Sequence, residues 1–317
     1  LDRGIITFSF LIIAPILKSI KSKYPDAEII LICSESAKAL AEKLKLADKI
    51  FGISVPWTNW RWSVFEWYDI WKFANSFHLL DIDLAIDFKG DLRNAWFLWK
   101  THPKISFGYN TTGGGYFFTN SYAMDQNAHQ YLRAFKLIQQ FGCQLVKDKE
   151  TRYHSKKKGC IVLHSGSSDI ERSWPDSYWE ELVRLLAEKF KVSFVITKES
   201  STLFHRLKTE GYELEFFEGN LVRLCDYFNA QKCLIALDSM AGHLASYLGI
   251  PVISLFGSQN PDLTKPINKY GKIIKPGISC KHKRSHWRLC RICMESILPK
   301  EVYNKVLAHV LHIESNL

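Results

Sequence analysis

The stretch that most constrains the fold runs from Cys233 to Pro261 and reads CLIALDSMAGHLASYLGIPVISLFGSQNP. It predicts a buried strand at 234–237, a polar turn at 238–243, an apolar helix at 244–248 and a second buried strand at 252–256. Strand, turn, helix and strand form a βαβ unit, so the surrounding sheet should be parallel. Backbone N–H groups at the start of the helix converge near Asp238 and Ser239. We therefore predict an anion-binding site there, at the carboxyl ends of the strands.

The same alternation of short apolar runs and helical patterns fills the rest of the chain. In the first half it predicts strands at 5–13, 28–33, 49–55, 82–88 and 105–109, with helices at 15–24, 34–46, 63–77, 92–100 and 128–141. In the second half it predicts strands at 159–164, 192–196 and 212–217 besides the two above, with helices at 176–190, 201–210, 221–229 and 299–313. Three consecutive glycines at 113–115 require a flexible or tightly turned loop.

A lysine-rich polar segment at 147–158 has no apolar periodicity and separates the two halves. We expect a domain boundary there, giving two domains, 1–152 and 153–317. Each should be an α/β domain with a doubly wound parallel sheet, and the two should face each other across a cleft. A surface loop within one domain is the alternative.

Composition narrows the class of protein and its partners. An apolar fraction of 47% and a charged fraction of 23% are typical of a soluble globular protein. The apolar run at 5–17 is too short to span a membrane, is interrupted by Pro15, and is followed by no cleavage site, so we expect a cytoplasmic protein. The net charge of +10 suits nucleic acid, an anionic membrane surface or an acidic small substrate. The aromatic residues concentrate at 57–99, where we expect an unusual partner.

Three of the eight cysteines cluster near the end of the chain. Cys280, Cys290 and Cys293 follow a C-x9-C-x2-C spacing, with His282 and His286 between the first two. These residue types suit zinc or iron, but the spacing is not that of a standard zinc finger. Reduced free thiols are the favoured interpretation, so no metal is predicted.

Residues 238–261 resemble the donor-binding signature of glycosyltransferase family 9, the ADP-heptose:lipopolysaccharide heptosyltransferases. Met240 stands where that family usually has glycine. Three more segments resemble the family in the same order along the chain: IDLAIDFKGDLRNAWFLWKTHPKISFGYN at 82–110, HSGSSDIERSWPDSYWEELVRLL at 164–186 and CRICMESILPKEVYNKVLAHV at 290–310.

The resemblance implies a GT-B fold of two Rossmann-like domains, with the acceptor bound by the first and the nucleotide sugar by the second. It implies inverting transfer of heptose from ADP-L-glycero-D-manno-heptose to a lipopolysaccharide inner-core acceptor, Kdo-lipid A or heptosylated core, without a metal cofactor. The residues that would bind the donor and its two phosphates are Ser167, Ser168, Arg172, Asp238, Ser239, Ala241, Gly242 and His243.

The general base is where the chain departs from the family pattern. Phe8-Ser9 occupies the position of the family's Gly-Asp, whose aspartate is the proposed base. Serine at its ordinary pKa cannot remove the proton of an acceptor hydroxyl without a partner base, so Ser9 or Asp87 would have to serve in catalysis. Three alternatives stay open: an inactive sugar-nucleotide-binding paralogue, a heptosyltransferase acting on a protein, and a sugar-nucleotide epimerase.

Basic residues of the first half would meet the acidic sugars and phosphates of an anionic glycolipid acceptor. The candidates are Lys18, Arg61, Lys89 and Arg93. The tryptophans at 57–71 suit the core, an interface or the membrane surface where a lipid acceptor lies. We expect a monomer that binds no nucleic acid and makes peripheral contact with the inner face of the bacterial inner membrane.

Overall fold

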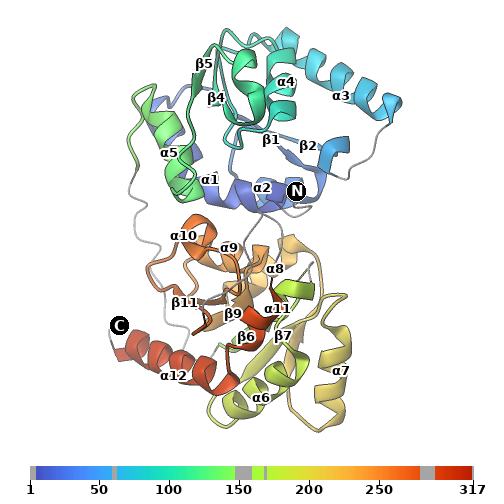
Figure 1. Ribbon diagram of the computed structural model, residues 1–317, viewed down its shortest axis with the longest axis vertical. Helices are drawn as coiled ribbons and strands as arrows, with labels where there is room; N and C mark the ends of the chain where they lie inside the picture. The colour runs from blue at the N-terminus through green and yellow to red at the C-terminus, as the bar shows by residue number, and fades with distance from the viewer. Residues whose placement is uncertain (1–4, 59–62, 147–158, 168–169, 279–289, 316–317) are drawn as a thin grey trace. The chain divides into compact units, whose positions relative to one another are not determined.

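The computed structural model describes residues 5–58, 63–146, 159–167, 170–278 and 290–315 and divides into two compact units, Leu1–Lys147 and Asp148–Leu317 (Figure 1). Both units alternate strands with helices, and every strand pair is parallel. The predicted α/β class with parallel sheets is therefore confirmed. Within the described residues, no helix is long and apolar enough to cross a membrane.

The described strands of unit 1 form two groups, and the strands within each group are parallel. β1 pairs with β2, and β4 lies between β3 and β5. The strands are β1 (Ile30–Ser34), β2 (Lys49–Ile53), β3 (Leu84–Ile86), β4 (Ile105–Tyr109) and β5 (Asn120–Tyr122). The helices are α1 (Ile5–Lys23), α2 (Glu35–Lys43), α3 (Val64–Ser76), α4 (Leu92–Lys100) and α5 (Gln130–Gln139), with 3₁₀ turns η1 (Pro56–Thr58), η2 (Phe77–Leu80) and η3 (Thr111–Phe117).

Helices cover both faces of these strands. On one face, Ile70 and Ala74 of α3 and Phe97 of α4 form a cluster with Val55 and Trp57, and Ile32 of β1 packs against it. α1 packs against α5, β1 and α2. The glycine loop is tightly turned, and Gly113 adopts a φ of 84° within η3.

The strand predicted at 5–13 is wrong, because these residues form the first half of α1. A continuous apolar run does not distinguish a buried strand from a buried helix, and here it extends into the helical pattern that follows. Pro15 lies inside the helix and lacks an N–H donor, so it should have ended the helix. The Ser19 hydroxyl donates to the Pro15 carbonyl at 2.9 Å, and the helix continues to Lys23.

Unit 2 contains one six-stranded parallel sheet with the order β11-β10-β9-β6-β7-β8. The strands are β6 (Ile161–His164), β7 (Val192–Val195), β8 (Glu215–Phe217), β9 (Cys233–Leu237), β10 (Val252–Leu255) and β11 (Lys272–Ile274). The helices are α6 (Asp176–Ala187), α7 (Ser201–Thr209), α8 (Leu221–Phe228), α9 (Met240–Tyr247), α10 (Pro261–Thr264), α11 (Arg291–Glu295) and α12 (Pro299–Ser315), with a 3₁₀ turn η4 (Ile170–Arg172).

A large apolar core lies on one face of this sheet. Trp179 and Leu182 of α6, Phe204 of α7 and Val306 of α12 pack there against inward residues of β6, β7, β9 and β10. α6 contacts both α7 and α12, whereas α8 and α9 contact each other, and the two groups lie on opposite sides of the strands in Figure 1. The prediction of a polar turn at 238–243 is wrong in part. The helix begins at Met240, so Met240 to His243 form its first turn.

Candidate functional site

Asp238 and Arg172 meet at the carboxyl edge of the sheet in unit 2. Asp238 directly follows β9, and Arg172 ends η4, which follows β6. β6 and β9 are parallel neighbours in the sheet, with His164 opposite Ala236. Asp238 and Arg172 therefore lie at the same edge of the sheet. Arg172 Nη1 lies 3.9 Å from Asp238 Oδ2, and the two side chains are only 20% and 17% exposed. The carboxylate thus holds a guanidinium at this edge, and a guanidinium suits an anionic ligand.

Ser239 adds a hydroxyl beside this pair. It is the N-cap of α9, with φ −148° and ψ 163°, but its side chain makes no capping hydrogen bond. Its Oγ is buried and has no hydrogen-bond partner among the described residues. A buried hydroxyl without a partner costs free energy, which a bound ligand would recover. Ser239 also stands at the start of α9, and the amino end of a helix favours an anion because its first N–H groups lie outside the regular intrahelical pattern.

The other predicted residues of this segment lie in the first turn of α9. Ala241, Gly242 and His243 are all buried. A Cβ on Gly242 would approach Pro266 Cγ to 3.3 Å, so this glycine allows close packing inside the unit. These three residues therefore shape the start of the helix, where Ser239 and the backbone lie.

His164 is a site residue that the sequence analysis missed. It is the last residue of β6, and its Nδ1 is buried without a hydrogen-bond partner in the described part of the chain. Burial lowers the pKa of this histidine to about 4, so the imidazole is neutral at pH 7. The Ser165 hydroxyl is also buried and lacks a partner among those residues. The signal was present, since both residues are polar and lie at the carboxyl end of an apolar strand, as Asp238 lies at that of β9.

The remaining predicted donor residues are placed less fully. Ser167 is described and partly buried in the loop after β6, whereas Ser168 lies outside the described residues. The structure thus brings together Arg172, Asp238 and Ser239.

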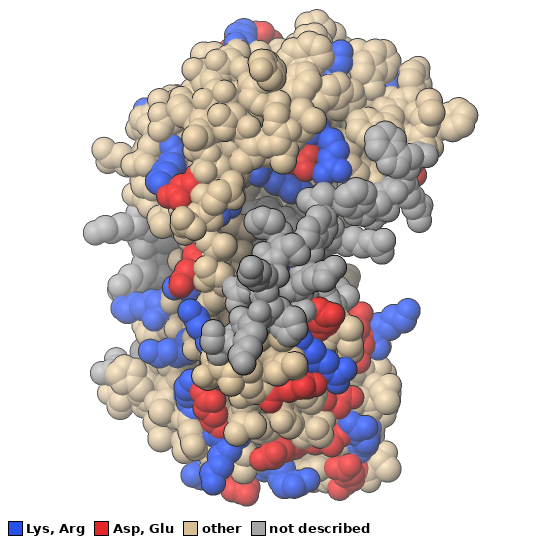
Figure 2. Space-filling view, in the orientation of Figure 1, with Lys and Arg blue, Asp and Glu red and all other residues tan. Residues whose placement is uncertain are grey.

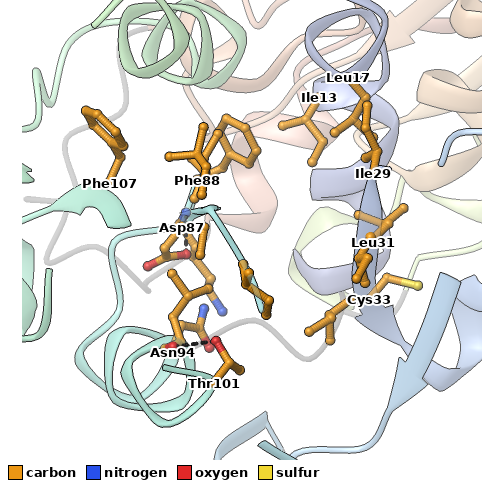
Figure 3. Close-up of a pocket in the computed structure, with 18 of the residues that line it drawn as sticks. Ile13, Leu17, Ile29, Leu31, Cys33, Asp87, Phe88, Asn94, Thr101 and Phe107 are labelled. Carbon is orange, nitrogen blue, oxygen red and sulfur yellow. Dashed lines mark hydrogen bonds between the residues drawn. The ribbon is translucent and has the colours of Figure 1, made fainter. Parts of the chain in front are cut away.

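In unit 1, Asp87 directly follows β3 and is buried. Its Oδ1 accepts the Lys89 N–H and its Oδ2 accepts the Gly90 N–H, each at 3.0 Å. Burial raises the pKa of this carboxyl to about 6 in spite of these hydrogen bonds. Figure 3 shows Asp87 and Phe88 on the wall of a cavity of about 900 Å³, which Lys89 also lines. Ser9 lies in α1, and its side chain is outside the described part of the structure.

The predicted acceptor residues are not all brought together. Arg93 pairs with Asp91, through Nε to Oδ1 at 2.9 Å and Nη2 to Oδ2 at 2.7 Å, so part of its charge is already balanced. Lys18 is exposed on α1 and lines a different depression, with Lys21 and Asp48. Arg61 lies outside the described residues.

The tryptophans divide between the core and the surface. Trp57 is buried, donates from Nε1 to Asn94 Oδ1 at 3.3 Å and lies 5.2 Å from the ring of Trp67. α3 exposes large apolar side chains on its outer face: Val64, Phe65, Tyr68 and Trp71.

The cysteine cluster is described only in part. Cys290 and Cys293 are buried around the start of α11, and Cys280 lies outside the described residues. Among the residues that the structure describes, no group of three His, Cys, Asp or Glu side chains could hold a metal ion.

Two units with helix-flanked parallel sheets, one of them with polar side chains at its carboxyl edge, are typical of the GT-B class of fold. Residues 70–290 match the model of glycosyltransferase family 9 (heptosyltransferase). The chain therefore belongs to glycosyltransferase family 9.

Known relatives agree with this assignment. Lipopolysaccharide heptosyltransferase 1 of Pseudomonas aeruginosa is 24% identical in an alignment 212 residues long, which covers 61% of this chain and 59% of that protein. The structure of Escherichia coli heptosyltransferase WaaC with ADP has a TM-score of 0.78 at 15% identity, over 96% of this chain and 97% of that one. E. coli ADP-heptose lipopolysaccharide heptosyltransferase II has a TM-score of 0.76 at 15% identity, over 97% of both chains. At these identities, the two structures establish the fold alone.

Proposed function

We propose that this protein transfers heptose from ADP-heptose to a lipopolysaccharide inner-core acceptor, with inversion at the anomeric carbon. The observation that carries the proposal is the group at the carboxyl edge of the six-stranded sheet. Arg172 faces Asp238 there, beside a buried Ser239 hydroxyl and the start of α9. The family supports the reaction, and the ADP in the WaaC structure and the name of the Pseudomonas relative support the donor and the acceptor.

In this proposal unit 2 binds the donor. The diphosphate accepts hydrogen bonds from Arg172, Ser239 and the first N–H groups of α9, and His164 and Ser165 contact the nucleotide sugar. When the bond between the anomeric carbon and the phosphate oxygen breaks, negative charge grows on ADP. A fixed guanidinium and the positive end of a helix stabilise that charge without reorganising. No metal is needed for this role.

Unit 1 would bind the acceptor, with Asp87 as the general base. A carboxylate with a pKa of about 6 is ionised at neutral pH, yet is a stronger base than an ordinary aspartate. It would take the proton of the acceptor hydroxyl as that oxygen forms its bond to the anomeric carbon. Lys89 lines the same cavity and would meet an acidic group of the acceptor.

A lipid-linked acceptor lies at a membrane surface, so we place the protein in the cytoplasm, as a monomer in peripheral contact with the inner membrane. The exposed side chains of α3 suit this contact. Phe65 is 82% exposed and Trp71 37% exposed. Unit 1 also displays few charged side chains on the face shown in Figure 2.

Calorimetric titration with ADP tests the donor site. Arg172→Ala should weaken ADP binding about 10–100-fold, because a charge-assisted hydrogen bond contributes about 1.5–3 kcal/mol. Arg184→Ala is the matched control, since Arg184 is exposed on α6 in the same unit and hydrogen-bonds Tyr212 at 3.2 Å. It should leave the affinity unchanged. Equal affinity of the Arg172→Ala variant and the wild type, both folded, would contradict the donor assignment.

A further inference from the structure

The contact with Asp238 does not by itself fix the direction of the Arg172 side chain. Arg172 Nη1 lies 3.9 Å from Asp238 Oδ2, which is longer than a hydrogen bond, so this contact draws the guanidinium to the edge through charge. The direction also depends on the backbone that carries the side chain. That backbone is η4, a single 3₁₀ turn in which the Ser173 N–H donates to the Ile170 carbonyl at 3.1 Å. So short a turn depends on its neighbours for a fixed position.

Trp174 joins this turn to the segment between α11 and α12. The indole is 2% exposed, and its Nε1 donates to the Ile297 carbonyl at 2.9 Å. Only Ser173 separates Trp174 from Arg172, so the Cα atoms of the two residues are at most about 7 Å apart. A displacement of the indole therefore displaces Arg172 as well.

Trp179 shows that a buried tryptophan of this core does not need such a hydrogen bond. Its ring is fully buried and lies 4.9 Å from the ring of Trp174. Its Nε1 nevertheless has no hydrogen-bond partner in the part of the chain that the structure describes. Both rings belong to one apolar core. Packing alone thus accounts for Trp179, whereas Trp174 packs and also makes a directional contact with a loop beside η4.

α11 links that contact to a second loop of the carboxyl edge. The Cys290 N–H, directly before α11, donates to Ser258 Oγ at 3.1 Å. A Cβ on Gly257 would lie 2.6 Å from Met294 Sδ, so α11 packs closely on this loop, which follows β10. α11 also contacts η4, which follows β6 (Figure 1). β9 lies between β6 and β10, so the two loops flank Asp238.

We propose that Trp174 is a positioning residue for the donor: supported by α11, it holds η4 so that Arg172 meets the phosphates of the nucleotide. This role rests on the proposed function, because the position of Arg172 matters only if Arg172 binds the donor. Loss of the indole N–H leaves the Ile297 carbonyl buried without its donor. The turn then adopts further positions in which the guanidinium faces away from the phosphates, and ADP binding weakens by the fraction of protein that remains competent.

Calorimetric titration with ADP tests this role through matched variants. Trp174→Phe keeps an aromatic ring in the core but removes the N–H, and should weaken ADP binding about 3–10-fold. Trp179→Phe makes the same change where the N–H has no partner among the described residues, and should bind ADP like the wild type. In an Arg172→Ala background, Trp174→Phe should change the affinity less than about twofold, because a residue that acts through another adds nothing once the other is removed.

Three results would overturn the role of Trp174. They are wild-type affinity of the folded Trp174→Phe variant, equal weakening by the two tryptophan variants, and an effect of Trp174→Phe that persists in full without Arg172. The last two would assign the effect to a loosened core or to another contact. Undiminished ADP binding by Arg172→Ala would instead contradict the donor site itself, so the two failures are distinguishable.

A second variant loosens α11 from its other end, in case Trp174→Phe does not fold. Ser258→Ala removes the acceptor of the Cys290 N–H. It should weaken ADP binding about 2–5-fold, and less than about twofold beside Arg172→Ala. Wild-type affinity of Ser258→Ala, or the same weakening without Arg172, would count against α11 as the support.

Discussion

Asp87 directly follows β3 in unit 1 and Asp238 directly follows β9 in unit 2, but their surroundings give them different chemistry. Asp238 faces the Arg172 guanidinium. Asp87 faces two backbone N–H groups in a buried site that raises its pKa to about 6. A carboxylate that orients a cation suits ligand binding, and a carboxylate with a raised pKa suits proton transfer.

The pKa of Asp87 predicts how stability depends on pH. The folded protein holds this proton up to about pH 6, whereas the unfolded chain releases it near 3.8, so Asp87 makes the protein less stable as pH rises between these values. The full effect is about 3 kcal/mol. The Tm of Asp87→Asn minus that of the wild type should therefore grow from pH 4 to pH 7. A difference that is independent of pH would contradict the raised pKa.

For His164 we predict the opposite dependence: its contribution to stability grows as pH rises. Its pKa falls from 6.5 to about 4 on folding, so its contribution is fully present above pH 6.5 and is lost as pH falls toward 4. The Tm of His164→Gln minus that of the wild type should shrink as pH rises from 4 to 6.5. Thermal unfolding of both variants over one pH series checks both predictions together. If the Tm difference from the wild type changed in the same direction with pH for both variants, this account would be ruled out.

Residue chemistry was predictable where a strand ends in a polar side chain. Asp238 was predicted from such a position and Arg172 from the family resemblance, and the two lie together. Lys18 was grouped with Lys89 because it is basic, but the phase of a helix decides where it faces. Leu17 lines the large cavity, and the next residue lies about 100° further around α1. No sequence signal indicated that Asp91 would pair with Arg93.

At the scale of elements, strong patterns gave accurate boundaries. α4 and β4 have the predicted bounds. Asp91 is the N-cap of α4, and β4 lies between two polar segments. β5 and β11 were missed, since their residues, NSY and KII, stand among polar residues and belong to no longer apolar run. α1 was predicted in part as a strand because an apolar run leaves the choice to tertiary contacts, here with α5, β1 and α2.

α3 carries a prediction about membrane binding. Replacing Phe65 and Trp71 by glutamate should weaken binding to phosphatidylethanolamine–phosphatidylglycerol vesicles at least about tenfold, because it removes apolar area and adds negative charge. Cosedimentation measures the effect. Tyr116→Glu is the control, since Tyr116 is 96% exposed in η3, away from α3, and should bind like the wild type. Equal binding of all three proteins would exclude α3 as the contact.

At the scale of the whole molecule, the sequence predicted two α/β halves from the repeated alternation, and the family from four segments in order. The strand order within each sheet was not predictable, because it depends on long-range pairing that local patterns do not record. That order makes β6 and β9 neighbours in unit 2, and Arg172 and Asp238 meet at their carboxyl ends.

The central claim is that this chain transfers heptose, and an acceptor-dependent turnover assay tests it most directly. The purified protein is incubated with ADP-heptose, with and without Kdo-lipid A, while ADP release and the mass of the lipid are followed. We predict ADP release only with the acceptor, a lipid heavier by one heptose, and loss of both in Arg172→Ala but not in Arg184→Ala. ADP binding without a heavier lipid, or ADP release that ignores the acceptor, would contradict the claim.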